Sequence, residues 1–344
     1  MHKPTLPCRP DQIDSFLAQP TPGAIESLRR LPGDVLIVGA GGKMGATQCL
    51  MTKAALDAIG SSFRVRAVSR FSSPQSRAAL ESAGVETISC DLLNRRDVEK
   101  LPDGANILFL AGQKFGTTER PDITWAMNTL VPAHLAERYA ASRIVAFSTG
   151  CVYSFADVTG SGSTEDSPTQ PIGDYPNSCL GRERIFEFYS RQNGTRVALY
   201  RLNYAIDFRY GVLIDVAQKV AAGEPVDVTM GHANVIWQGD ACARALQCLE
   251  VAASPAVPIN ITGPEIVAIR DLAEQFGQLL GKTPKITGSE AGQAWLNDAS
   301  KSFALFGKPS VTLDQMIEWT AAWIQSDGAT LGKPTHFEVR SGKF

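Results

Sequence analysis

Short apolar segments alternate with longer amphipathic ones through the first two hundred residues. Short apolar or alternating runs are typical of strands, and longer segments with apolar residues three and four apart are typical of helices. The expected strands lie at 35–38, 63–68, 85–89, 107–110 and 143–147, and the expected helices at 46–59, 75–83 and 124–140. Strands and helices that alternate at this interval form right-handed βαβ units, so we expect a parallel sheet.

The pattern continues toward the C-terminus after one polar interruption. Residues 154–174 are rich in Gly, Ser, Thr and Pro and predict a surface loop. Further strands are expected at 196–201, 234–237 and 258–262, and further helices at 11–18, 24–30, 178–192, 212–222, 240–252, 269–280 and 313–325. In a parallel sheet, ligands bind beyond the carboxyl ends of the strands, so each strand end is a candidate contact point.

The first strand runs directly into a glycine-rich turn. Gly39, Gly42 and Gly45 have the spacing G-x-x-G-x-x-G, and a helix is expected from Ala46. A strand, a tight glycine turn and a helix place backbone N–H groups at a helix N-terminus, where a pyrophosphate can bind. Glycine clusters also mark ordinary turns, so this variant of G-x-G-x-x-G needs support from further motifs.

Composition narrows the class of protein. The net charge of −2 and the lack of a basic run interleaved with aromatic residues argue against a nucleic-acid partner. The seven cysteines form no C-x-x-C pair and the four histidines no local cluster, so we expect neither a disulfide framework nor a metal site. We find no signal peptide and no apolar run of transmembrane length, which favours a cytoplasmic protein with no membrane partner.

Further motifs follow the strand ends in order. They are Asp91-Leu92, Leu110-Ala111-Gly112, Asn128, Ser148 to Tyr153, Tyr175, Arg201-Leu202-Asn203 and Asn260-Ile261-Thr262-Gly263. With the glycine turn, this series resembles the extended short-chain dehydrogenase/reductase superfamily, in its NAD-dependent epimerase/dehydratase branch, over about residues 33–330. The resemblance implies an α/β fold with a Rossmann-type doubly wound parallel sheet and a smaller C-terminal substrate lobe. The expected division is an N-terminal extension (1–32), a Rossmann domain (33–204, with 234–262 returning to it), and the substrate lobe with the C-terminal tail (205–233 and 263–344).

The resemblance also implies the catalytic residues. In this family the tyrosine after the polar loop, here Tyr175, is the general acid/base, and a Ser or Thr at the fifth strand end, here Thr149, orients the substrate hydroxyl. A lysine four residues after the tyrosine normally lowers the pKa of the phenol, whose ordinary value of about 10 is too high for a base at neutral pH. This chain has Cys179 at that position, and a neutral thiol supplies no fixed positive charge.

Three interpretations of Cys179 are open. Another cation can replace the lysine, and the candidates are Arg182, on the same helical face, and Lys114, after the fourth strand. Cys179 can itself exchange the proton as a thiol. Alternatively, turnover has been lost and the protein is a dinucleotide-binding sensor or scaffold.

The expected cofactor is NADP, with NAD as the alternative. An arginine at the second strand end accommodates the 2′-phosphate of NADP, whereas a carboxylate there binds the ribose of NAD. The chain has Ser69-Arg70 at this point and Lys43 in the glycine turn, groups that can converge on a phosphate; an Arg70 stacked on adenine would instead serve either cofactor. The expected cofactor contacts are Gly39, Gly42, Lys43, Met44, Gly45, Ser69, Arg70, Asp91, Leu92, Ala111, Gly112, Asn128, Tyr175 and Asn203.

The expected substrate follows from what the chain lacks. Many relatives grip nucleotide-diphosphate sugars with an Arg-Asp pair early in the region that here spans 232–240, where this chain has no arginine. We therefore expect an NAD(P)-dependent oxidoreductase or epimerase that acts on a small carbohydrate, namely a free sugar, sugar acid or lactone; a nucleotide sugar is the alternative. The candidate substrate contacts are Tyr153, Arg209, His232 and Trp237. The resemblance further implies a homodimer formed through the helices at 124–140 and 178–192.

Overall fold

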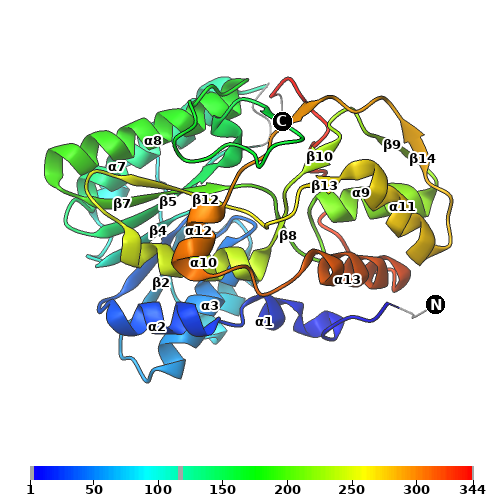
Figure 1. Ribbon diagram of the computed structural model, residues 1–344. Coiled ribbons are helices and arrows are strands. Elements are labelled where there is room, and N and C mark those ends of the chain that lie inside the picture. The colour runs from blue at the N-terminus through cyan, green and yellow to red at the C-terminus, as the bar shows by residue number, and fades with distance from the viewer. Residues whose placement is uncertain (1–3, 115–118, 343–344) are drawn as a thin grey trace.

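The computed structural model describes residues 4–114 and 119–342, and a seven-stranded parallel sheet lies at its centre (Figure 1). From edge to edge the strands are β12 (Val257–Ile261), β7 (Arg196–Leu202), β5 (Arg143–Thr149), β4 (Asn106–Phe109), β1 (Val35–Val38), β2 (Val65–Ser69) and β3 (Glu86–Ser89). Every neighbouring pair is parallel, and Val35 lies level with Val65 of β2 and Asn106 of β4. This order is that of a doubly wound Rossmann-type sheet, with its switch point between β1 and β4. The expected fold class is confirmed.

Helices cover both faces of the sheet, and the alternation of residues along each strand explains why. In β1, Val35 and Ile37 belong to one apolar core, while Leu36 and Val38 belong to another on the opposite face. The first core is covered by α2 (Pro22–Arg30), α3 (Gly45–Ala58), α4 (Pro74–Ser82) and α10 (Gln238–Val251), and the second by α5 (Arg95–Glu99), α7 (Val131–Arg138) and α8 (Asp174–Asn193). A strand buried on both sides is mostly apolar, which is why β1 appears in the sequence as a continuous apolar run.

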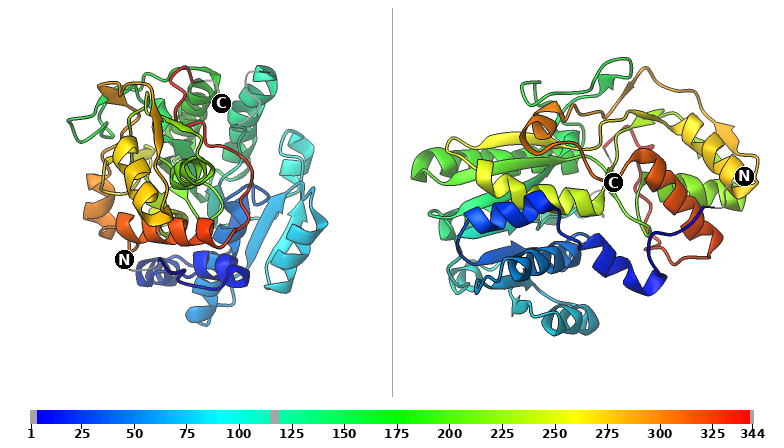
Figure 2. Two further views of the ribbon diagram at one scale, coloured as in Figure 1. Left: turned by 90° about the vertical axis from the view of Figure 1, so that its right-hand side faces the viewer. Right: turned by 60° about the horizontal axis from the view of Figure 1, so that its bottom comes forward.

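A smaller lobe lies at one end of the sheet (Figures 1 and 2). Its helices are α9 (Val212–Ala222), α11 (Ile269–Leu280) and α13 (Leu313–Gln325), and they share a third apolar core. The N-terminal helix α1 (Ile13–Leu17) packs on this lobe, because Phe16 contacts both Trp237 and Trp319 edge-on. The N-terminal segment therefore joins the sheet domain to the lobe within one chain.

Short elements complete the chain. They are η1 (Pro10–Gln12), η3 (Gly150–Val152), β6 (Ala156–Asp157), β8 (Ala205–Ile206), β9 (Pro225–Asp227), β10 (His232–Ala233), β11 (Ile236–Trp237), β13 (Val267–Ala268), β14 (Lys285–Thr287), β15 (Gln293–Ala294) and α12 (Ser300–Phe306). Most were not expected from the sequence, because two-residue pairings such as β6 with β15 leave no periodic signal. Within the described ranges, no helix is both long and apolar enough to cross a bilayer.

Two expected helices differ from the structure in ways that affect the site. The helix expected at 124–140 is divided into α6 (Pro121–Trp125), a π-helical turn η2 (Ala126–Leu130) and α7, since Pro132 has no N–H to donate to the Asn128 carbonyl. The helix expected at 178–192 begins earlier, at Asp174. Tyr175 therefore lies in the first turn of α8.

Candidate active site

The glycine turn between β1 and α3 has the shape that a pyrophosphate requires. Gly39 has φ +93°, and a Cβ there would lie 2.5 Å from the backbone nitrogen of Ala111, so only glycine fits. A Cβ at Gly45 would overlap the carbonyl oxygen of Ala40, whereas one at Gly42 would meet only the Gly39 carbonyl, at 3.3 Å. The turn therefore packs closely against β4 and leaves the N-terminus of a 14-residue helix open to a ligand.

A cavity of about 580 Å³ lies beside this turn, at the carboxyl ends of the strands. Many of the expected site residues line it, from the glycine turn, β4, β5, α8 and β7: Gly39, Gly42, Lys43, Met44, Gly45, Lys114, Thr149, Tyr175 and Asn203. The position next to the β1–β4 switch point is where open parallel sheets bind their ligands. The glycine turn and the cavity therefore lie where a dinucleotide would bind in a sheet of this type.

Tyr175 faces this cavity as a neutral phenol. Burial raises its pKa well above the ordinary value, and the neighbouring thiols of Cys179 and Cys151 raise it further, while the Arg182 guanidinium acts in the opposite direction. The Tyr175 hydroxyl and the Cys179 thiol are hydrogen-bonded to each other. Tyr175 is therefore a proton donor at neutral pH, and it becomes a base only when positive charge reaches it.

Cys179 does not reach a substrate. Its side chain is fully buried, and burial raises the pKa of its thiol to about 11. It packs against Tyr175 and Val152 in a small apolar cluster and is absent from the cavity wall. Cys179 therefore has no direct access to a ligand in this cavity, which argues against the interpretation in which its own thiol exchanges the proton.

Arg182 and Lys114 are the two cations near this pair. Arg182 is buried and donates to the carbonyl of Phe147 (2.5 Å) and to Oδ1 of Asn128 (2.6 Å), and its charge lowers the pKa of both Tyr175 and Cys179. Lys114 lines the cavity, and its ammonium lies 3.4 Å from the carbonyl oxygen of Thr335. Burial lowers the pKa of Lys114. Arg182 thus lowers the pKa of Tyr175 through the electrostatic effect of its charge. Lys114 lines the cavity, where it can contact a ligand.

Thr149 and Asn128 hold the surroundings of Tyr175 in place. Thr149 ends β5, and its hydroxyl accepts from the backbone N–H of Cys151 at 3.2 Å while facing the cavity. Asn128, expected to contact cofactor, is fully buried in the π-helical turn, where it bonds the backbone of Gln113 and the guanidinium of Arg182. Asn128 is therefore a positioning residue, and the expected cofactor contact is corrected.

The cations expected at a 2′-phosphate do not converge. Lys43 donates to the carbonyl of Ala205 at 3.0 Å and lies 4.3 Å from the centroid of the Tyr210 ring, beyond β7. Ser69 and Arg70 end β2, on the other side of β1, where Ser69 lies beside Gly41 and Arg70 is exposed. The expected joint grip on a 2′-phosphate is therefore wrong for Lys43, because its side chain turns toward β7.

Other expected cofactor residues lie outside the cavity wall. Asp91 accepts from the backbone N–H of Leu93 at 3.1 Å, and so caps its own loop. Leu92 and Ala111 belong to an apolar core. Gly112 makes room for the Arg182 guanidinium, since a Cβ there would overlap it.

The substrate candidates are also dispersed. Tyr153 is buried, donates to Oδ1 of Asn260 (2.9 Å) and accepts from Arg201 (2.6 Å), so it is a structural residue. Trp237 is buried among Phe16, Phe208 and Trp319 in the core of the lobe. The expectation of substrate contacts from Tyr153 and Trp237 is therefore wrong.

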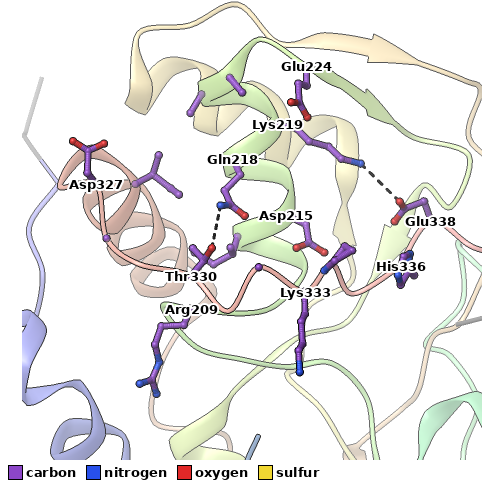
Figure 3. Close-up of a pocket in the computed structure, with 17 residues that line it drawn as sticks. Arg209, Asp215, Gln218, Lys219, Glu224, Asp327, Thr330, Lys333, His336 and Glu338 are labelled. Atoms are coloured by element: carbon purple, nitrogen blue, oxygen red, sulfur yellow. Dashed lines mark hydrogen bonds and ion pairs between the residues drawn. The ribbon is translucent and has the colours of Figure 1, made fainter. Parts of the chain in front are cut away.

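Arg209 and His232 stand apart from the cavity. Arg209 pairs with Asp14 of α1 (2.9 Å) and borders a second cavity of about 670 Å³ between α9 and the C-terminal tail (Figure 3). In that cavity Lys219 pairs with Glu338, and Gln218 bonds Thr330. His232 begins β10 and lines neither cavity.

Some cavity residues had no signal in the sequence. Tyr204 and Tyr210 follow β7, and Leu331, Lys333 and Thr335 come from the tail after α13. No motif marks them, and the tail reaches the site only because the lobe folds back on the sheet.

The fold defines an α/β protein of the Rossmann type, with a cavity at the carboxyl edge of its sheet. The model of the NAD-dependent epimerase/dehydratase family matches residues 35–234, and the chain belongs to this family. No curated protein matches the sequence.

Solved structures show the same fold at low sequence identity. MoeE5 in complex with UDP-glucose and NAD is 21% identical with a TM-score of 0.67, covering 86% of this chain and 99% of that one. UDP-glucuronic acid 4-epimerase from Bacillus cereus in complex with NAD is 21% identical with a TM-score of 0.70, covering 85% and 99%. dTDP-glucose 4,6-dehydratase from Bacillus anthracis in complex with NAD is 19% identical with a TM-score of 0.70, covering 86% and 97%.

Proposed function

We propose that this protein is a nicotinamide-dinucleotide-dependent oxidoreductase or epimerase that acts on a small carbohydrate. The observation that carries the proposal is that Tyr175, Thr149 and the glycine turn, distant in sequence, open on one cavity at the carboxyl edge of the sheet. The bound dinucleotide would supply the hydride acceptor or donor. The backbone N–H groups of the glycine turn would hold its pyrophosphate.

The roles of the side chains follow from their protonation. Tyr175, a neutral phenol, donates its proton to the substrate oxygen in the reductive direction and must take one up in the oxidative direction. Thr149 aligns that oxygen through its hydroxyl. Arg182 replaces the missing lysine electrostatically, since it lowers the pKa of Tyr175 from behind the cavity wall.

The C-terminal tail lines one side of the cavity, which supports a small substrate. Tail residues Leu331, Lys333 and Thr335 form one wall of it, which restricts the space beyond the dinucleotide. Arg209, the arginine expected to grip an anionic group, is already paired with Asp14. A nucleotide sugar is the second candidate, favoured by the UDP-glucose bound in MoeE5.

A sensor or scaffold without turnover is the rival from another class. The hydrogen bond between Tyr175 and Cys179 favours it, because the family lysine is replaced by a group that raises the pKa of the phenol. A screen of sugars, sugar acids and lactones for a change in reduced-nicotinamide absorbance, run with NAD and with NADP, separates the two. Turnover on any of them supports the enzyme, and tight dinucleotide binding without turnover on any supports the sensor.

Lys43 is expected to make dinucleotide binding dependent on pH. Burial lowers its pKa to about 8, although Asp207 partly offsets this. The ammonium, which favours a pyrophosphate, is lost as pH rises through that value, so the dissociation constant should increase about tenfold between pH 7 and pH 9. Calorimetric titration of the dinucleotide measures this slope.

The Lys43→Met variant should bind more weakly at pH 7 and show a flat profile. Lys53→Gln, which replaces a lysine paired with Asp57 elsewhere on α3, is the matched control and should keep the slope. A Lys43→Met profile as steep as that of the wild type would refute the role of Lys43.

Arg70 is expected to decide between NADP and NAD. It directly follows β2, whose last residue is Ser69, and it is exposed where a 2′-phosphate would lie. Arg70→Ala should weaken NADP binding by about tenfold or more, because one charge-assisted hydrogen bond to the 2′-phosphate is lost. NAD has no 2′-phosphate, so its binding should be unchanged. If Arg70→Ala weakens the binding of NADP and of NAD equally, Arg70 stacks on the adenine. The argument for NADP over NAD would then fail.

Exposed apolar side chains support the expected homodimer. Trp125, Leu130 and Phe188 are 39%, 46% and 58% exposed and lie on α6, η2 and α8, the region through which relatives are expected to pair. The dimer stays a prediction.

A further inference from the structure

The cavity of about 580 Å³ beside the glycine turn is lined by charged side chains of one sign. Its wall, as far as the described residues form it, carries three lysines, Lys43, Lys114 and Lys333, and no aspartate or glutamate. A cleft lined by one sign of charge concentrates ligands of the opposite sign. The dinucleotide pyrophosphate accounts for the charge next to the glycine turn, at Lys43. The other two lysines lie at or near the C-terminal tail: Lys114 donates to the Thr335 carbonyl, and Lys333 belongs to the tail itself.

The C-terminal tail carries Lys333 and, two residues further on, the Thr335 carbonyl that accepts from Lys114. The tail is fixed on both sides of Lys333: the backbone N–H of Leu331 donates to Arg209 (3.0 Å), and that of Thr335 donates to Asp215 (2.8 Å). Beyond them Phe337 is buried in the core of the lobe. The segment that carries Lys333 is thus held by contacts to the lobe.

Lys333 and Lys114 border the same space. Lys333 lines both cavities, and its side chain extends away from α9 (Figure 3). The Lys114 ammonium lies 3.4 Å from the carbonyl of Thr335, two residues further along the tail. Lys114 and Lys333 therefore line the same cavity as Tyr175 and Thr149.

We propose that the substrate carries an anionic group, a carboxylate or a phosphate, and that Lys333 of the C-terminal tail and Lys114 bind it. This inference rests on the proposed function and narrows it to a sugar acid or sugar phosphate rather than a neutral sugar or lactone. An ammonium donates charge-assisted hydrogen bonds to such a group, which a neutral polyol cannot match. Lys333 and Lys114 are then specificity determinants, and the tail is part of the active site.

The test is a comparison of matched ligands by calorimetry at constant ionic strength, with and without saturating dinucleotide. The ligands are glucose, glucuronate, glucose 6-phosphate and UDP, and the proteins are the wild type, Lys333→Gln and Lys282→Gln. Lys333 and Lys282 are both exposed, so neither change should disturb folding, and Lys282 lines neither cavity. We expect glucuronate or glucose 6-phosphate to bind at least about tenfold more tightly than glucose, the factor expected for one charge-assisted hydrogen bond.

The Lys333→Gln protein should lose most of this preference, while Lys282→Gln should keep it. The stronger of the two anions then identifies carboxylate or phosphate as the group recognised. Equal binding of charged and neutral sugars, or an unchanged preference in Lys333→Gln, would overturn the inference. Tighter binding of UDP than of either sugar anion would also overturn it, in favour of a nucleotide sugar. Failure of the dinucleotide to bind would instead overturn the proposed function, and the titrations without it would still decide the anion preference.

Discussion

Replacing Tyr175 by phenylalanine is expected to reduce kcat/KM by about 10²–10⁴-fold, the range contributed by one general acid/base. Phenylalanine keeps the ring that packs against Cys179 and removes only the hydroxyl that exchanges the proton. Dinucleotide affinity should therefore stay unchanged, and the free energy of unfolding should fall by no more than about 1 kcal/mol, the loss of the hydrogen bond to Cys179. Steady-state kinetics on a substrate found in the screen, together with a dinucleotide titration, measure kcat/KM and dinucleotide affinity.

Tyr189→Phe is the matched control for this substitution. Tyr189 lies on the same helix, α8, where its hydroxyl donates to Glu137 on the surface, so its loss should leave kcat/KM unchanged. A Tyr175→Phe enzyme as active as the wild type would refute the catalytic assignment. A loss of dinucleotide binding equal to the loss of activity would assign Tyr175 to cofactor binding rather than to proton transfer.

Replacing Glu183 by glutamine is expected to destabilise the protein by about 3–5 kcal/mol. Glu183 and Arg201 form an ion pair at 2.7 Å whose side chains are 0% and 4% exposed, directly behind the strand end that carries Thr149. Ser148 also donates to Glu183, and Arg201 also donates to Tyr153. Without the carboxylate, the guanidinium would remain buried and uncompensated. Urea denaturation followed by circular dichroism measures the change in the free energy of unfolding.

Two further variants show whether burial is the cause. Glu187→Gln, one turn along α8, breaks the more exposed pair with Arg184 and should cost less than about 1 kcal/mol. The double variant Glu183→Leu/Arg201→Met removes both charges and should be less destabilised than Glu183→Gln alone. If Glu183→Gln lowers the free energy of unfolding by no more than Glu187→Gln does, the buried Glu183–Arg201 pair does not stabilise the protein as described.

The sequence predicted the scaffold well because its constraints are local. Strands buried on both faces are mostly apolar, as Val35–Val38 are throughout, and this preference holds wherever the rest of the chain lies. The turn after β1 needs glycine at 39 and 45 because backbone atoms of Ala111 and Ala40 occupy the space of a Cβ. Such requirements restrict the residue types allowed at these positions, so they can be recognised in the sequence.

Side-chain directions at the site were less predictable. Lys43 lies in the glycine turn, as expected, but its ammonium is bound by Ala205, 162 residues later in the chain. Trp237 was expected to meet a substrate, and instead it packs against Phe16 of the N-terminal segment. In both cases the partner that decides the orientation is distant in sequence and belongs to no motif.

The sequence by itself determined the parallel sheet, the glycine turn after β1, the order of the strand-end motifs and the presence of Cys179 in place of the family lysine. The tertiary structure alone decided which cations face the cavity, that Tyr153 and Trp237 are buried, and that a C-terminal tail carrying Lys333 forms a wall of the site. The physical reason is the distance along the chain over which each constraint acts. Backbone geometry and burial in a strand act over a few residues and so impose a pattern, whereas the surroundings of a side chain are assembled from segments whose proximity depends on the whole fold.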